Sequence, residues 1–111
     1  MIAYVDIDGT ICSIVEYGDG TRNYKKARPL QERIDRLNDL YKSGWEIHYW
    51  TARGAQSGLD WTEETERQLQ NWGCLYTSLN MKKPHYDIWI DDKAMQADLF
   101  FADFNRDGGE Y

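Results

Sequence analysis

The chain has 111 residues, of which 41% are hydrophobic, and it carries 13 Lys and Arg against 19 Asp and Glu. This length predicts a single domain over residues 1–111, because two smaller domains would each bury too little surface. The net charge of −6 argues against general binding to nucleic acids or anionic membranes, because an acidic surface repels phosphate groups.

The first apolar run, Ile2–Val5, is too short for a signal peptide or a membrane span. Cys12 and Cys74 are the only cysteines. They are too few for a disulfide framework and do not resemble a zinc ligand set. A cytoplasmic protein with no membrane partner is therefore expected.

Apolar runs alternate with helical patterns along the chain. Short runs predict buried strands at residues 2–5, 45–50, 75–79 and 88–90. A helix is predicted from Leu30 to Tyr41, with Gly44 as its stop, and a second from Trp61 to Trp72. A third helix is predicted over residues 94–104.

This order of elements predicts an α/β fold with a doubly wound, Rossmann-like parallel sheet and helices on both of its faces. Residues 11–26 interrupt the first crossover. Asp19-Gly20, set between Tyr17 and Tyr24, is a hairpin turn signal and predicts a short β-hairpin flap. This insert and the loop at residues 54–60 are too short to form a separate cap domain.

Polar residues follow the end of each predicted strand. In chain order they are Asp6, Asp8, Gly9 and Thr10; Thr51, Ala52 and Arg53; Lys82 and Lys83; and Asp91 and Asp92. The carboxyl ends of parallel strands meet at one edge of a sheet, where open α/β sheets bind their ligands. We therefore expect these side chains to form one site.

Four carboxylates at one edge repel one another unless a cation lies among them. Oxygen ligands without nearby His or Cys favour a hard ion, with Mg²⁺ as the default. A carboxylate in that setting can attack phosphorus and form an aspartyl-phosphate. A second carboxylate two residues later can protonate the leaving oxygen and then activate water. The pattern thus predicts a phosphatase.

These residues also carry a family resemblance. Asp6-Ile-Asp8-Gly9-Thr10, Thr51 after a hydrophobic strand, a lysine before the last strand and Asp91-Asp92 after it resemble, in order, the four motifs of the haloacid dehalogenase superfamily. The resemblance implies Asp6 as nucleophile, Asp8 as general acid and base, and Thr51 and Lys83 as ligands of the transferring phosphoryl group. Because dehalogenases lack the second acid, Asp8 favours a phosphatase or phosphomutase.

The resemblance further implies Mg²⁺ held by the Asp6 side chain, the Asp8 backbone carbonyl and Asp91, with Asp92 binding directly or through water. The stretches around Asp6, Thr51 and Asp91 are similar to small capless phosphatases of capsule polysaccharide biosynthesis. The phosphatase half of phage polynucleotide kinases has a similar layout.

Several alternatives stay open at this stage. Lys82 rivals Lys83 as the phosphate-binding lysine, although Lys83 directly precedes Pro84 as in the capsule-type relatives. Arg53 is the candidate for a substrate-specific contact, and a surface salt bridge is the alternative.

The substrate class is open as well. A small phosphorylated metabolite such as a sugar phosphate is the first hypothesis, and a nucleotide or a polynucleotide 3′-end is the second. A non-catalytic phosphate-binding domain is the alternative of another class. A site without a lid takes its specificity from the flap or from a neighbouring subunit, so we expect a homo-oligomer.

Overall fold

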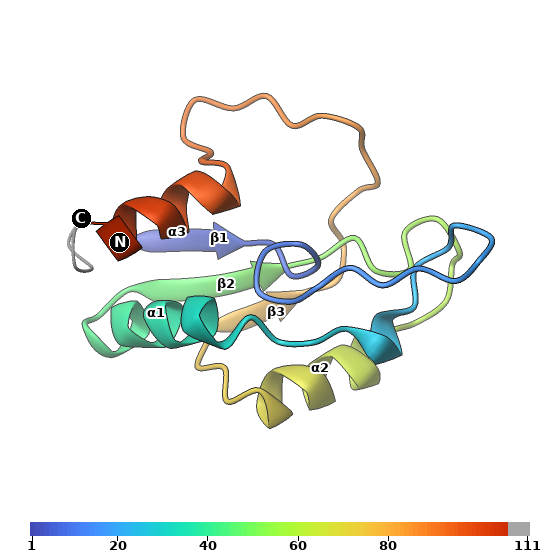
Figure 1. Ribbon diagram of the computed structural model, residues 1–111, viewed down its shortest axis with the longest axis horizontal. Helices are drawn as coiled ribbons and strands as arrows, with labels where there is room; N and C mark the ends of the chain where they lie inside the picture. Colours follow the sequence, from blue (N-terminus) through green and yellow to red (C-terminus); the bar gives the residue numbers. More distant parts are fainter. Residues whose placement is uncertain (107–111) are drawn as a thin grey trace.

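The computed structural model describes residues 1–106, which fold around a three-stranded parallel sheet (Figure 1). β1 (Ile2–Val5), β2 (Glu46–Trp50) and β3 (Ser78–Asn80) lie side by side in chain order. Val5 is opposite Tyr49 on β2, and Trp50 is opposite Asn80 on β3. The carboxyl ends of all three strands therefore meet at one edge, and the predicted α/β architecture with a parallel sheet is confirmed.

The helices form close to the predicted positions. α1 (Gln31–Lys42) precedes β2, α2 (Thr62–Asn71) precedes β3, and α3 (Ala97–Arg106) closes the described part of the chain. A 3₁₀ turn, η1 (Tyr24–Lys26), precedes α1. A glycine follows the end of each of these two helices by two residues, Gly44 after α1 and Gly73 after α2. The residue after each glycine donates its backbone N–H to the last turn of the helix, Trp45 to the Leu40 carbonyl and Cys74 to the Leu69 carbonyl.

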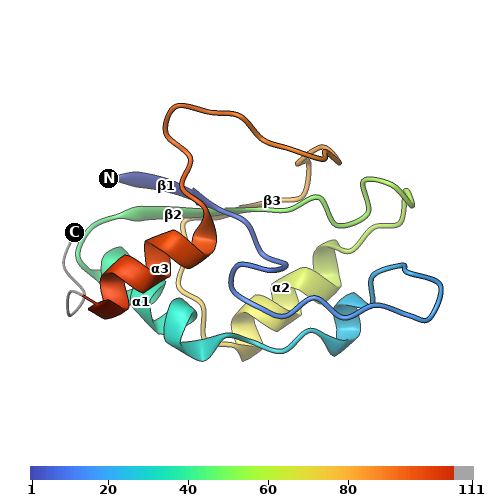
Figure 2. The ribbon, with the colours of Figure 1, turned by 45° about the horizontal axis from the view of Figure 1, so that its top comes forward.

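The hydrophobic core lies between the sheet and the three α-helices. Ile47 and Tyr49 of β2 meet Leu37 of α1, Leu69 of α2 and Phe101 of α3, all of them buried. Figure 2 shows the three α-helices on one side of the sheet and the long loop before α3 on the other. The expectation of helices on both faces is therefore wrong in this structure.

The fourth predicted strand, at residues 88–90, is also absent. Ile88 and Ile90 are 75% and 88% exposed, and Trp89 is 40% exposed although its ring contacts those of Trp50 and Tyr86. A run of three residues with one such contact lacks a second apolar contact to fix it on the sheet. β1 is consequently an edge strand, paired only with β2 among the described residues.

The hairpin flap is present as expected. Tyr17 N–H donates to the Thr21 carbonyl at 2.8 Å and Asn23 N–H to the Val15 carbonyl at 2.7 Å, with a single bridge between Glu16 and Arg22. No cap domain accompanies it within residues 1–106. None of the helices in this range is long and apolar enough to cross a membrane.

Candidate active site

The carboxyl edge of the sheet brings together residues from three strand ends. Asp6 follows β1, Thr51 follows β2, and Lys83 comes three residues after β3. The Lys83 Nζ lies 3.6 Å from Asp6 Oδ1. The Lys83 backbone N–H donates to the Thr51 carbonyl at 3.2 Å, and Thr51 N–H donates to the Asn80 carbonyl at 2.9 Å. Backbone hydrogen bonds thus fix the lysine beside the first carboxylate.

Lys83 is surrounded by aromatic rings. Its Nζ lies 5.0 Å from the centre of the Tyr86 ring, 5.7 Å from Trp89 and 5.8 Å from Trp50. A cation near the faces of aromatic rings is attracted by their electron density. Lys82 is exposed instead. Of the two rival lysines, the structure brings Lys83 to Asp6.

The loop after Asp6 is tightly folded. The Ile7 carbonyl accepts the N–H groups of Thr10 and Ile11 at 3.0 and 2.9 Å, and Gly9 N–H donates to the Cys12 carbonyl at 2.9 Å. Ile7 and Ile11 are buried and anchor the loop in the core. The Thr10 carbonyl accepts a 3.1 Å hydrogen bond from Arg33 of α1. The predicted binding residues Gly9 and Thr10 are therefore held by the backbone and by α1.

Asp8 forms a salt bridge with Arg53, and this salt bridge is not at the surface. The Arg53 Nε and Nη2 atoms donate to the two Asp8 carboxylate oxygens at 2.9 and 2.8 Å. Arg53 is 3% exposed. Its position in the loop after β2 is stabilised by Thr51, whose Oγ1 accepts the Arg53 backbone N–H at 3.1 Å. Ala52, between them, accepts a turn hydrogen bond from Ala55 at 2.9 Å.

The environment of the two carboxylates differs. Burial raises the pKa of Asp6 above its usual value and nearby Asp8 adds to this, while the Lys83 charge opposes the increase. For Arg53, burial by itself lowers the pKa, but the hydrogen bonds and charge of Asp8 outweigh it and the pKa is raised. Each carboxylate of the loop therefore has its own cation, Lys83 for Asp6 and Arg53 for Asp8.

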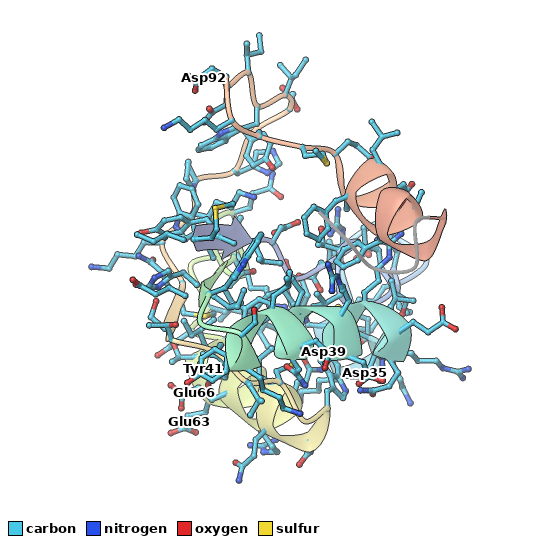
Figure 3. The ribbon with its side chains drawn as sticks, turned by 90° about the vertical axis from the view of Figure 1, so that its left-hand side faces the viewer. Asp35, Asp39, Tyr41, Glu63, Glu66 and Asp92 are labelled. Carbon is cyan, nitrogen blue, oxygen red and sulfur yellow. The ribbon has the colours of Figure 1, made fainter. Side chains whose placement is uncertain are left out.

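Asp91 and Asp92, the remaining predicted metal ligands, are not gathered with these residues. Both are exposed on the loop before α3, and Figure 3 shows Asp92 at the outer part of that loop, away from the helices. The Asp91 carboxylate accepts the Lys93 backbone N–H at 2.9 Å. Within residues 1–106, no three acidic, His or Cys side chains lie close enough to hold a metal ion.

Three residues that sequence reasoning did not assign to the site contact Arg53. Thr65 and Gln68 of α2 accept hydrogen bonds from its Nη1 at 3.1 and 2.6 Å, and the Tyr24 ring lies 4.8 Å from its guanidinium carbon. The sequence did contain an indication for the first two, because Thr65 and Gln68 are polar residues on the buried face of α2. A polar residue on such a face needs a buried partner.

Comparisons with known proteins give one similar structure. No protein-family model matches this sequence, and a search of curated proteins finds no match. The chain is similar to the crystal structure of an MCSG target from Vibrio cholerae, with a TM-score of 0.74 and 24% sequence identity. The likeness covers 89% of this chain and 85% of that chain. At this identity it supports the fold and says nothing about the chemistry.

Proposed function

We propose that this chain is a phosphomonoester phosphatase that acts through an aspartyl-phosphate at Asp6 on a small phosphorylated metabolite. The observation that carries the proposal is the pairing of Asp6 with Lys83 at the strand ends, 3.6 Å apart. In this pair the carboxylate can act as the nucleophile, and the ammonium can bind the oxygens of the phosphate group. The Asp6 side chain is 37% exposed, so a substrate can reach it.

In the proposed reaction, an Asp6 carboxylate oxygen attacks phosphorus as the bond to the leaving oxygen breaks. Asp8 starts the cycle protonated and gives its proton to that leaving oxygen. Water then attacks the aspartyl-phosphate and transfers a proton to Asp8, which releases inorganic phosphate and restores Asp6. The Thr51 Oγ1 already accepts the Arg53 backbone N–H, so its own proton is free to be donated to a phosphate oxygen.

The Mg²⁺ ligands that the resemblance implies are not together in this arrangement, because Asp91 and Asp92 are exposed on the loop before α3 and no three acidic, His or Cys side chains of residues 1–106 lie close together. The Asp8 carboxylate is also engaged by Arg53 at both oxygens. The reaction steps above therefore assign no role to a metal. The ligand chemistry nevertheless suits Mg²⁺ if Asp91 and Asp92 reach Asp6.

We propose that they reach it when residues 88–90 pair with the free edge of β1, which gives the sheet its fourth strand. Two observations support this: β1 is hydrogen-bonded only to β2 among the described residues, and Ile2, Ile88 and Ile90 are exposed apolar side chains. An unpaired edge is a template for another strand. A strand at 88–90 would end directly before the two aspartates, next to the end of β1.

Amide hydrogen exchange tests this pairing. We expect Mg²⁺ to slow exchange in residues 88–90 of the wild type and of Asp87→Asn, an exposed control in the same loop. We expect no such protection in Asp91→Asn. Binding of Mg²⁺ without new protection would contradict the pairing.

Phosphate release from a metabolite panel, with Mg²⁺ present, tests the function. We expect Asp6→Asn to abolish turnover. Asp39→Asn on α1, which makes the same charge change near the opposite edge of the sheet, should retain it. Turnover that survives in Asp6→Asn would refute the nucleophile. A wild type without activity that still binds phosphate would favour the non-catalytic alternative.

A mononucleotide is the second candidate substrate. The exposed parts of Tyr86 and Trp89 beside Lys83 favour a leaving group with a ring, because nucleobases stack on aromatic side chains. Comparing a sugar phosphate, a mononucleotide and a 3′-phosphorylated oligonucleotide separates the candidates. The net charge of −6 disfavours the oligonucleotide.

A further inference from the structure

Arg53 forms a bidentate contact with Asp8. Its Nε lies 2.9 Å from Oδ2 and its Nη2 lies 2.8 Å from Oδ1. The Arg53 side chain is fully buried and the Asp8 side chain is 11% exposed. The planar guanidinium matches the two oxygens of a carboxylate, a geometry that lysine does not reproduce. The contact therefore fixes the plane of the Asp8 carboxylate as well as balancing its charge.

The guanidinium is itself fixed from behind. Its Nη1 donates to Thr65 Oγ1 at 3.1 Å and to Gln68 Oε1 at 2.6 Å, both on α2. The Gln68 Nε2 in turn donates to the Tyr24 carbonyl at 2.8 Å, and the Tyr24 ring lies 4.8 Å from the Arg53 guanidinium carbon. Arg53 is thus a buried link between α2, the end of the flap and Asp8, and its hydrogen bonds go to protein atoms.

The hydrogen bonds at Asp8 leave its two oxygens unequal. Oδ1 accepts from Arg53 Nη2 and lies 3.5 Å from the Cys12 thiol, whose one proton also has the Ile7 carbonyl at 3.6 Å, whereas Oδ2 accepts from Arg53 Nε. A carboxylate has about four lone-pair positions, two on each oxygen. Among the contacts of residues 1–106, Oδ1 has two neighbouring donors and Oδ2 has one, so Oδ2 keeps a lone-pair position with no donor near it.

We propose that Arg53 is a positioning residue for proton transfer, which orients Asp8 so that Oδ2 is the oxygen that exchanges the proton. This inference rests on the proposed phosphatase reaction and replaces the substrate-contact interpretation of Arg53. The proton moves from Oδ2 to the leaving oxygen as the phosphorus–oxygen bond breaks. The carboxylate that remains is stabilised by the guanidinium already in contact with it, at no further cost of reorganisation. In the second half-reaction Oδ2 takes a proton from the attacking water.

The leaving group gives a readout that a merely structural role would not change. A p-nitrophenolate leaves without a proton, whereas an alkoxide such as that of glycerol phosphate needs one. We measure kcat/KM for both substrates in the wild type, Arg53→Lys, Asp8→Asn and the double variant. Lysine keeps the positive charge and loses the bidentate geometry.

We expect Arg53→Lys to lower kcat/KM for the alkyl phosphate about tenfold or more beyond its effect on the aryl phosphate, within the range typical of general acid catalysis. Asp8→Asn should change the ratio in the same direction, and the double variant should change it no further. Arg67→Lys is the matched control, because Arg67 lies on the surface of α2 and pairs with Glu64 at 2.8 Å. It should leave both rates unchanged.

The Thr65→Val variant covers the case in which Arg53→Lys does not fold. It removes one hydrogen-bond acceptor of Arg53 and keeps the side-chain volume, so we expect a smaller change in the same ratio. Equal losses for both substrates in Arg53→Lys or Thr65→Val would overturn the positioning role while the phosphatase stands. A wild type inactive on both substrates would overturn the phosphatase and the positioning role together.

Discussion

Gly54 and Gly58 form a matched pair in the loop that follows Arg53. Both have positive φ angles, +85° and +76°. A Cβ on Gly54 would lie 2.1 Å from the Leu59 carbonyl oxygen, whereas a Cβ on Gly58 has nothing within 4 Å. Replacing each by alanine therefore separates backbone strain from a steric clash in the same loop.

The expected costs follow from these contacts. A left-handed conformation costs alanine about 1–2 kcal/mol, and the smaller entropy of the unfolded alanine chain returns about 0.4–1 kcal/mol. Gly58→Ala should thus destabilise by about 1 kcal/mol. Gly54→Ala adds the displacement of a backbone carbonyl, which we compare with overpacking at about 1–3 kcal/mol. The difference between the variants is then about 2 kcal/mol.

Urea unfolding measures this difference. With a slope of about 2 kcal/mol/M, the midpoint of Gly54→Ala should lie about 1 M below that of Gly58→Ala. Because Gly54 directly follows Arg53, its variant should also shift the aryl-to-alkyl ratio of kcat/KM. Equal midpoints would refute the close approach of the Leu59 carbonyl to Gly54.

Two further predictions follow from the environment of buried and paired groups. Burial raises the pKa of Cys12 to about 12 and that of Cys74 to about 11, so both thiols stay protonated at pH 8. A disulfide reagent should modify them slowly in the native protein and rapidly in urea, and fast native reaction would contradict their burial. Arg33, 2.6 Å from Asp98, lowers the pKa of that carboxyl. The stability that the Asp98 carboxylate contributes is present above its unfolded pKa and is lost as the pH falls through its lower folded pKa. The Asp98→Asn variant should therefore lose less stability than the wild type on acidification, which circular dichroism can follow.

The sequence predicted best what depends on local patterns. The apolar run Ile2–Val5 predicted a strand, and the helical spacing of apolar residues predicted α1. Both are in the structure, because each of the two elements has an inward face long enough to pack. The convergence of Asp6, Thr51 and Lys83 followed from parallel pairing alone, since strands that run the same way end at the same edge. The flap followed from the Asp19-Gly20 turn.

The secondary structure of residues 88–90 and the direction of the Arg53 side chain could not be predicted from the sequence. In a run as short as residues 88–90, the residues do not distinguish a strand from an exposed loop, because that depends on whether a free edge is available to pair with them. Arg53 lies beyond the end of β2, where the alternation of strand side chains no longer applies. Its inward direction depends on Thr65 and Gln68, which are 12 and 15 residues away along the chain.

The charges at the strand ends connect the absence of a strand at residues 88–90 with the burial of Arg53. The sequence argument required a cation because four carboxylates were expected together, but Asp6 and Asp8 each meet a protein cation, Lys83 at 3.6 Å and Arg53 at 2.8 Å. When both carboxylates are ionised, these four side chains are neutral as a set. Addition of Asp91 and Asp92 by pairing of residues 88–90 with β1 would bring two further negative charges, the amount that one Mg²⁺ neutralises. If residues 88–90 pair with β1, we expect metal binding and formation of the fourth strand to be coupled, because the pairing brings the two added charges to this edge.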